Sequence, residues 1–178
     1  MTNEKLLTEN PARYPTPKRV ALSSGLIAVC IFVFDFMMAS PTFSGFLLIY
    51  TLIILLPVTL LSIRNKPKLH AAATKLLVYT VFIAATFGFY AYDLSLARQR
   101  SDVVIAAVER YYQQHDSYPS SLLDLVPDYL PSIPKPRIAP SEFMYLNAPE
   151  NPQLIYTGLS PFERYAWQFE QREWSYLD

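Results

Sequence analysis

Histidine and cysteine, which are frequent catalytic residues and metal ligands, are rare in this 178-residue chain, and their spacing does not bring them together. The two histidines are His70 and His115, and the single cysteine, Cys30, lies in the middle of a hydrophobic stretch. His115 adjoins Asp116, but sequence neighbours point to different faces of a helix, so the two cannot form the oriented geometry of a hydrolase triad. A zinc or iron site would need carboxylates for most of its ligands. We therefore predict no catalytic residue, no metal site and no cofactor, and a protein that is not an enzyme.

Asp35 is the one polar residue whose surroundings suggest a function, because it stands within the otherwise apolar segment 20–38. A carboxylate at the midplane of a bilayer costs about 2.5 to 3.5 kcal/mol, so such residues are functional candidates. Asp35 lies only four residues before Ala39, near the end of its segment, where headgroups and water lower that cost. Two interpretations stay open: a proton-handling or partner-binding carboxylate, or an interfacial anchor or hydrogen bond to Ser44 or Tyr90.

The elements that position Asp35 are three hydrophobic stretches, at about residues 20–39, 43–63 and 71–93. Each is close to the ~20 residues that a helix needs to cross ~30 Å of hydrocarbon. The first stretch follows a proline-rich tail, residues 1–18, and lacks a small-residue cleavage site, so we predict a retained helix rather than a signal peptide. We therefore expect a three-helix transmembrane region over residues 19–93, surrounded by the lipid bilayer.

Pro57 lies inside the second stretch and brings no N–H group to a helix. We expect a kink there. The carbonyl that proline leaves without a donor can be taken up by a neighbouring helix or by a hydroxyl such as that of Thr59.

Lysine and arginine are distributed unevenly around the three stretches. Basic residues precede the first stretch and lie between the second and the third (Lys5, Arg13, Lys18, Arg19, Arg64, Lys66, Lys68 and Lys75), whereas residues 39–44 carry no charge. Positively charged flanks stay in the cytoplasm during insertion. We predict a multi-pass protein of the bacterial inner membrane with a cytoplasmic N-terminus and a periplasmic domain at residues 94–178, where eleven acidic residues outnumber seven basic ones. The formal net charge of zero gives no reason to expect a nucleic-acid partner.

Beyond Tyr92 apolar residues continue at helical spacing with charged residues on the other faces, so the third helix is predicted to run on, from about Ala71 to His115. Asp116 to Pro119 should end it. Ser121 and Asp124 form a capping-box pattern, which predicts a short helix over 122–126, followed by an irregular proline-rich loop over 127–140. The remainder predicts four strands, at residues 142–147, 153–157, 164–170 and 173–177.

Aromatic residues recur in this second half, and two roles are open for them. The set Trp167, Phe169, Trp174 and Tyr176 is expected to supply core, because a domain of about 85 residues without disulfides needs large apolar side chains. A partner-binding patch is expected instead at the tyrosines beside the proline-rich loop, which are Tyr111, Tyr112, Tyr118 and Tyr129.

The run from Val104 through Tyr111-Tyr112, the Tyr118-Pro119 turn and Leu122-Leu123 to Ile133-Pro134 resembles the helix end and following loop of type II secretion pseudopilins and type IV pilins. This resemblance covers residues 94–178 and implies a long helix packed on a small antiparallel sheet. The family's leader peptide, its Phe-Thr-Leu-x-Glu start and its calcium-binding loop are missing, and two additional hydrophobic helices precede the third. The expected fold is thus an α+β membrane protein with a pilin-like domain that does not assemble into a fibre.

Three functions remain open. The first is a non-enzymatic membrane protein whose periplasmic domain binds a protein partner, most specifically an immunity protein that neutralises a toxin acting in the membrane or the periplasm. The second is an accessory component of a secretion or pilus system. The third is a small transporter or ion channel, which would depend on Asp35 and Pro57. The sequence carries no indication of the oligomeric state.

Overall fold

The computed structural model describes residues 15–148, 151–160 and 162–177, so the predicted N-terminal tail lies outside the described residues up to residue 14. The chain is α+β: three long apolar helices and a four-stranded antiparallel sheet. Contacts divide it into two units. The first holds residues up to 35 and residues 42–87, and the second holds residues 36–41 and 88–178.

The first unit is built from α1 (Pro17–Met37), the second hydrophobic stretch and the first part of α4 (Lys66–His115), and each of these three helices is long and apolar enough to cross a membrane. Pro17 begins α1, where its missing N–H costs nothing. Small residues of α1, Ser24 and Ala28, are buried, which lets helices approach closely. The unit's core is formed by Ala28, Leu47, Leu55, Tyr79 and Ile83. Large apolar side chains are exposed around it, which is the pattern expected of helices surrounded by lipid.

The second hydrophobic stretch is interrupted, as Pro57 predicted, but a π-helical turn forms the interruption. It consists of α2 (Thr42–Tyr50), the π-helix η3 (Thr51–Leu55) and α3 (Leu56–Leu61), and the N–H of Leu56 donates to the carbonyl of Thr51, five residues back. Of the two alternatives expected to take up the carbonyl freed by Pro57, a neighbouring helix or a hydroxyl such as that of Thr59, the Thr59 hydroxyl does not do so. In a regular helix that carbonyl belongs to Ile53, whereas the Thr59 hydroxyl donates to Leu55 at 2.7 Å.

The third helix, α4, is continuous for 50 residues, which confirms the predicted run from a membrane-type helix into an amphipathic one. It begins five residues earlier than predicted, and the side chain of Asn65 accepts the N–H of Lys68 at 3.2 Å at its start. It ends at His115, as predicted, because Asp116 adopts a left-handed conformation with φ of 50°. The polar second part of this helix belongs to the second unit.

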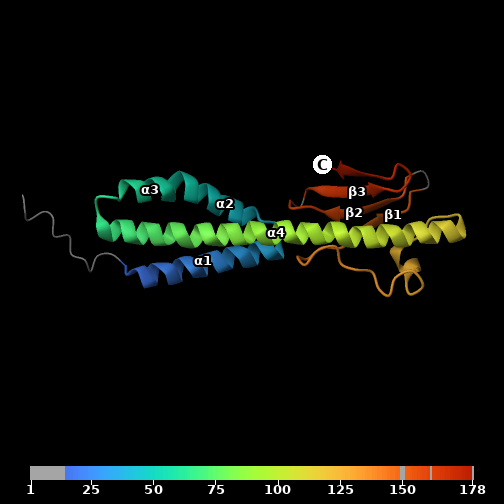
Figure 1. Cartoon of the computed structure of the whole chain (residues 1–178), viewed down its shortest axis with the longest axis horizontal. Coiled ribbons are helices and arrows are strands. Elements are labelled where there is room, and N and C mark those ends of the chain that lie inside the picture. Colours follow the sequence, from blue (N-terminus) through green and yellow to red (C-terminus); the bar gives the residue numbers. More distant parts are fainter. Residues whose placement is uncertain (1–14, 149–150, 161, 178) are drawn as a thin grey trace, which may run out of the picture. The chain divides into compact units, whose positions relative to one another are not determined.

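The sheet of the second unit is a meander in the order β1-β2-β3-β4, with β1 (Met144–Leu146), β2 (Gln153–Thr157), β3 (Arg164–Gln168) and β4 (Glu173–Leu177). Directly opposite residues share one face, so Tyr145, Leu154, Trp167 and Trp174 form one row across it. Figure 1 shows the strands alongside the second part of α4. The predicted strands were confirmed, although β1 and β3 are two to three residues shorter than predicted.

The core of this unit joins α4, the η4 turn and the sheet. It contains Val104, Val108, Leu122, Leu125, Leu130, Leu154 and Phe169, with Trp167 and Trp174 packed against it. The expected core role is thus confirmed for Trp167, Phe169 and Trp174, but Tyr176 is 55% exposed. The short helix η4 (Leu122–Leu125) is a single 3-10 turn that ends one residue before the prediction, and its Ser121/Asp124 capping box is present.

Candidate functional site

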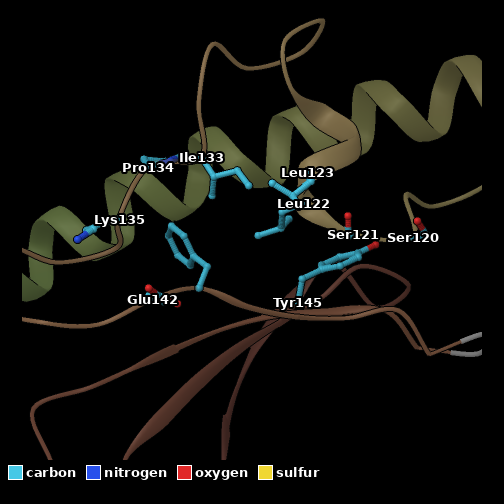
Figure 2. Close-up of a pocket in the computed structure, with 10 residues that line it drawn as sticks. Ser120, Ser121, Leu122, Leu123, Ile133, Pro134, Lys135, Glu142 and Tyr145 are labelled. Carbon is cyan, nitrogen blue, oxygen red and sulfur yellow. The ribbon is translucent and has the colours of Figure 1, made fainter.

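A groove of about 420 Å³ opens on the surface of the C-terminal domain (Figure 2). Its walls come from three segments: the start of η4 at residues 120–123, the loop at residues 133–135, and the chain entering β1 at residues 142–145. Lys135 and Glu142 lie at one end, the serines of η4 lie at the other, and Leu122 and Ile133 lie between them (Figure 2). The groove therefore has an apolar middle and polar ends, which suits a segment of another polypeptide.

The serine end of the groove is held in place by the capping box. The hydroxyl of Ser120 and the backbone N–H of Ser121 donate to the same oxygen of Asp124, at 2.6 and 2.9 Å. The bond from the Ser120 hydroxyl is the main cause that lowers the pKa of the Asp124 carboxyl, and the bond from the Ser121 N–H adds to it. This carboxyl therefore remains ionised at neutral pH. At the other end, Arg100 of α4 donates to the carbonyl of Lys135 at 3.0 Å and so fixes the loop that carries the lysine.

Tyr145 lines the groove at its serine end. Its hydroxyl oxygen is buried and has no hydrogen-bond partner among the described residues. Burial is the largest cause that raises the pKa of Tyr145 to about 12, with smaller contributions from Tyr118 and Asp124, so the hydroxyl stays protonated. A buried donor without a partner costs free energy. No sequence pattern pointed to Tyr145, because this residue has no special spacing.

Strand β1 forms one edge of the sheet, so no strand of the described chain pairs with its outer side. Met144 and Leu146 of this strand are exposed and alternate with Tyr145. An edge strand with apolar residues beside a groove is a place where an extended segment of another chain can pair.

The four tyrosines predicted as one partner-binding patch form two separate pairs. Tyr111 packs against Tyr129 with ring centroids 5.5 Å apart, and Tyr112 packs against Tyr118 at 4.4 Å. Tyr111, Tyr118 and Tyr129 also pack against the core, and Tyr112 is 42% exposed. None of the four lines the groove. Desolvation raises the pKa of Tyr118, as its partial burial requires.

His115 lies beside the first tyrosine pair and stacks on Tyr111 with centroids 4.1 Å apart. Its Nδ1 is 3.0 Å from the carbonyl of Tyr111, one turn earlier in α4. The two residues line a polar hollow with Asp124 and Asp128. Within the described part of the chain, no three His, Cys, Asp or Glu side chains are grouped so that they could hold a metal ion.

Asp35 is fully buried, and both of its carboxylate oxygens are hydrogen-bonded to the backbone. Oδ1 accepts the N–H of Phe43 at 2.7 Å, and Oδ2 accepts the N–H of Ser44 at 2.9 Å. These N–H groups belong to the first turn of α2, which has no carbonyl partners for them. The expected hydrogen bond between Asp35 and Ser44 is thus present, and its donor is the backbone N–H of Ser44. That Asp35 caps the start of α2 was not predicted.

A buried ion pair, which no sequence pattern predicted, joins Asp93 and Arg137. Arg137 Nε donates to Asp93 Oδ2 at 2.9 Å, and both side chains are 0% exposed. The other carboxylate oxygen accepts the N–H of Ile138, and Arg137 Nη1 donates to the carbonyls of Thr157 and Gly158. Asp93 stands at the end of the third hydrophobic stretch, but it does more than mark that end, because the pair ties α4 to the proline-rich loop and to the end of β2.

A second carboxylate organises the turn before β3. Glu163 accepts the hydroxyl of Tyr165 at 2.6 Å and the N–H of Leu159 at 2.9 Å. The bond from Tyr165 is the main cause that lowers the pKa of Glu163, and the same bond is the main cause that raises the pKa of Tyr165 to about 12. A Cβ at Gly158 would lie 2.6 Å from the Glu163 carboxyl, so a larger residue there would displace this carboxylate from its hydrogen bonds.

In comparisons with known proteins, no family model, curated protein or solved structure matches the chain.

Proposed function

We propose that this is a non-enzymatic protein of the bacterial inner membrane whose C-terminal domain binds a protein partner in the periplasm. Three helices of membrane-spanning length and the basic segments around them support the membrane placement and the orientation. The observation that carries the binding role is the groove beside β1, which has an apolar middle and two polar ends.

The partner segment that fits this place is extended. It pairs with the outer side of β1, so that alternate side chains enter the groove on one face and cover Met144 and Leu146 on the other. Lys135 and Glu142 then determine the register of the partner segment by pairing with opposite charges on it. Such pairs contribute more to specificity than to affinity. The most specific form of the proposal is an immunity protein whose partner is a toxin.

The test uses the full chain solubilised from membranes and the product of the adjacent gene, with binding measured by co-purification and protection measured by growth on co-expression. Glu142→Arg is expected to weaken binding and protection. Glu173→Arg, the matched control, changes an exposed glutamate on β4, the opposite edge of the sheet, and is expected to leave both unchanged.

Two results would contradict the proposed site. If Glu142→Arg and Glu173→Arg change binding and protection equally, Glu142 in the groove does not pair with a charge of the partner. If Tyr112→Ala abolishes binding while Glu142→Arg has no effect, the partner contacts the exposed tyrosine instead. If the adjacent gene product neither binds nor is neutralised, the immunity role is excluded.

The second candidate function is an accessory component of a secretion or pilus system. The observation that favours it is a long helix that continues into a domain with a small antiparallel sheet, which is the arrangement that the pilin resemblance implies. Co-purification of the full chain with pilin-type subunits, in place of the adjacent gene product, would select this function.

A further inference from the structure

A second groove, in the first unit, lies between the interrupted helix and the first part of α4. It has a volume of about 310 Å³ and is lined on one side by Tyr50, Leu55 and Val58, and on the other by Lys68, Ala72 and Lys75. Two features of the backbone and sequence form this groove. The π-helical turn and Pro57 interrupt the regular helix between α2 and α3, and the small side chains of two alanines on α4 leave space opposite. Figure 1 shows these segments next to one another.

The charge of this groove is entirely positive. Lys68 and Lys75 are seven residues apart on α4, two turns of helix, so they lie on the same face. No Asp or Glu occurs between residues 36 and 92 of the sequence. The one carboxylate in the described part of this unit is Asp35, and both of its oxygens accept backbone N–H groups.

Lys75 therefore has no carboxylate of its own unit to neutralise it, although its side chain is half-buried among apolar residues. Placing a cation against apolar surroundings is costly unless an anion or water accompanies it. An anionic group supplied from outside the chain satisfies this requirement.

We propose that this groove binds one anionic phospholipid, with its phosphate between Lys68 and Lys75 and part of an acyl chain against Leu55, Val58 and Ala72. Lipid is the occupant with both properties that the groove presents, an apolar chain for its interior and a negative charge for its lysines. The two lysines follow the basic segment that contains Arg64 and Lys66, so the site belongs to the leaflet that faces the cytoplasm in the proposed orientation.

The experiment measures lipid binding to the full chain in detergent by native mass spectrometry and by thermal shift. The probes are phosphatidylglycerol and phosphatidylcholine with identical acyl chains, and glycerol phosphate as the anion without a chain. We expect one retained phosphatidylglycerol per chain and weaker retention of phosphatidylcholine. Glycerol phosphate is expected to compete poorly.

The Lys68→Gln/Lys75→Gln variant is expected to weaken phosphatidylglycerol binding by roughly thirtyfold, because each basic residue near an anionic lipid contributes about fivefold. The control variant, Arg64→Gln/Lys66→Gln, removes two neighbouring charges that do not line the groove and is expected to change binding by less than about threefold. Ala71→Leu keeps all charges but narrows the groove, and it is expected to weaken phosphatidylglycerol binding while leaving glycerol phosphate unaffected.

Three outcomes overturn the proposal. Equal retention of phosphatidylglycerol and phosphatidylcholine by the unaltered chain removes the anion requirement, and this comparison needs no variant to fold. Equal losses in the two double variants show a diffuse attraction to the basic segment rather than a site. If Ala71→Leu binds phosphatidylglycerol as well as the unaltered chain does, the acyl chain does not occupy the groove. None of these results affects the proposed partner site, which lies in the other unit.

Discussion

Breaking the ion pair between Asp93 and Arg137 should strongly destabilise the C-terminal domain. Asp93→Asn keeps the shape of the side chain and an acceptor for the N–H of Ile138, but it leaves the charge of a fully buried arginine without its counter-ion. Removing one partner of such a pair costs about 3 to 5 kcal/mol. The total stability of a domain is only about 5 to 15 kcal/mol, so we expect partial unfolding under mild conditions.

A double-mutant cycle separates the pair from its surroundings. Arg137→Met leaves the carboxylate and the carbonyls of Thr157 and Gly158 without this donor, and it should also be costly. The double variant, Asp93→Asn with Arg137→Met, leaves no buried charge. Its loss is therefore expected to be smaller than the sum of the two single losses by at least about 2 kcal/mol.

The assay is urea unfolding of the full chain in detergent micelles, followed by tryptophan fluorescence. The chain has two tryptophans, Trp167 and Trp174, and both pack against the core of this domain, so the signal reports its unfolding. Arg100→Met is the matched control, because Arg100 tethers the same loop through an exposed bond to the carbonyl of Lys135 and should cost less than about 1 kcal/mol. The reasoning is refuted if Asp93→Asn costs no more than the control, or if the two single losses simply add.

Three further predictions concern other parts of the chain. Leu125→Ala, at a fully buried core position, is expected to cost about 2 to 5 kcal/mol in the same assay, whereas Leu123→Ala, at a position 72% exposed, should stay within about 0.5 kcal/mol. Asp35→Asn provides one acceptor oxygen where the start of α2 uses two, so a loss of about 1 to 3 kcal/mol in the free energy of unfolding is expected. It would be measured as a lower thermal unfolding temperature in micelles, and unchanged stability would contradict the capping role. The folded-state pKa of Glu163 is below its ordinary value of 4.5, so its stabilising effect is present above that pH and lost as the pH falls through the lowered pKa. Glu163→Gln should therefore flatten the acid side of the stability curve, and an unchanged curve would contradict this.

The regular elements could be predicted from the sequence because each depends on a local pattern. The switch from an uncharged segment to an amphipathic one after Tyr92, with no Gly or Pro from Tyr92 to His115, predicted that α4 is continuous. Ser121 and Asp124 predicted the η4 turn through a spacing of three residues. Alternating residues, with turns between them, predicted the four strands to within a few residues.

The sites depend on long-range contacts, which no local pattern reports. Asp93 and Arg137 are 44 residues apart, and an aspartate at the end of a hydrophobic stretch looks like an ordinary boundary charge. The four tyrosines were predicted as a binding patch because tyrosines are numerous beside the proline-rich loop, yet Tyr111 and Tyr112 lie on different sides of α4 and pair with different partners. The groove at Tyr145 is assembled from three segments and has no signature in any one of them.

The continuity of α4 has a consequence for how the protein is made. Residues 88–115 of this helix provide Val104 and Val108, against which the later segments pack, and they leave the ribosome before any strand of the sheet. The strands that complete the core, β2 to β4, begin only at Gln153, so the domain cannot close until they too have been synthesised. During that interval the apolar face of the helix is uncovered, and the order of synthesis makes this stage the point at which chaperones or proteases can act on the chain.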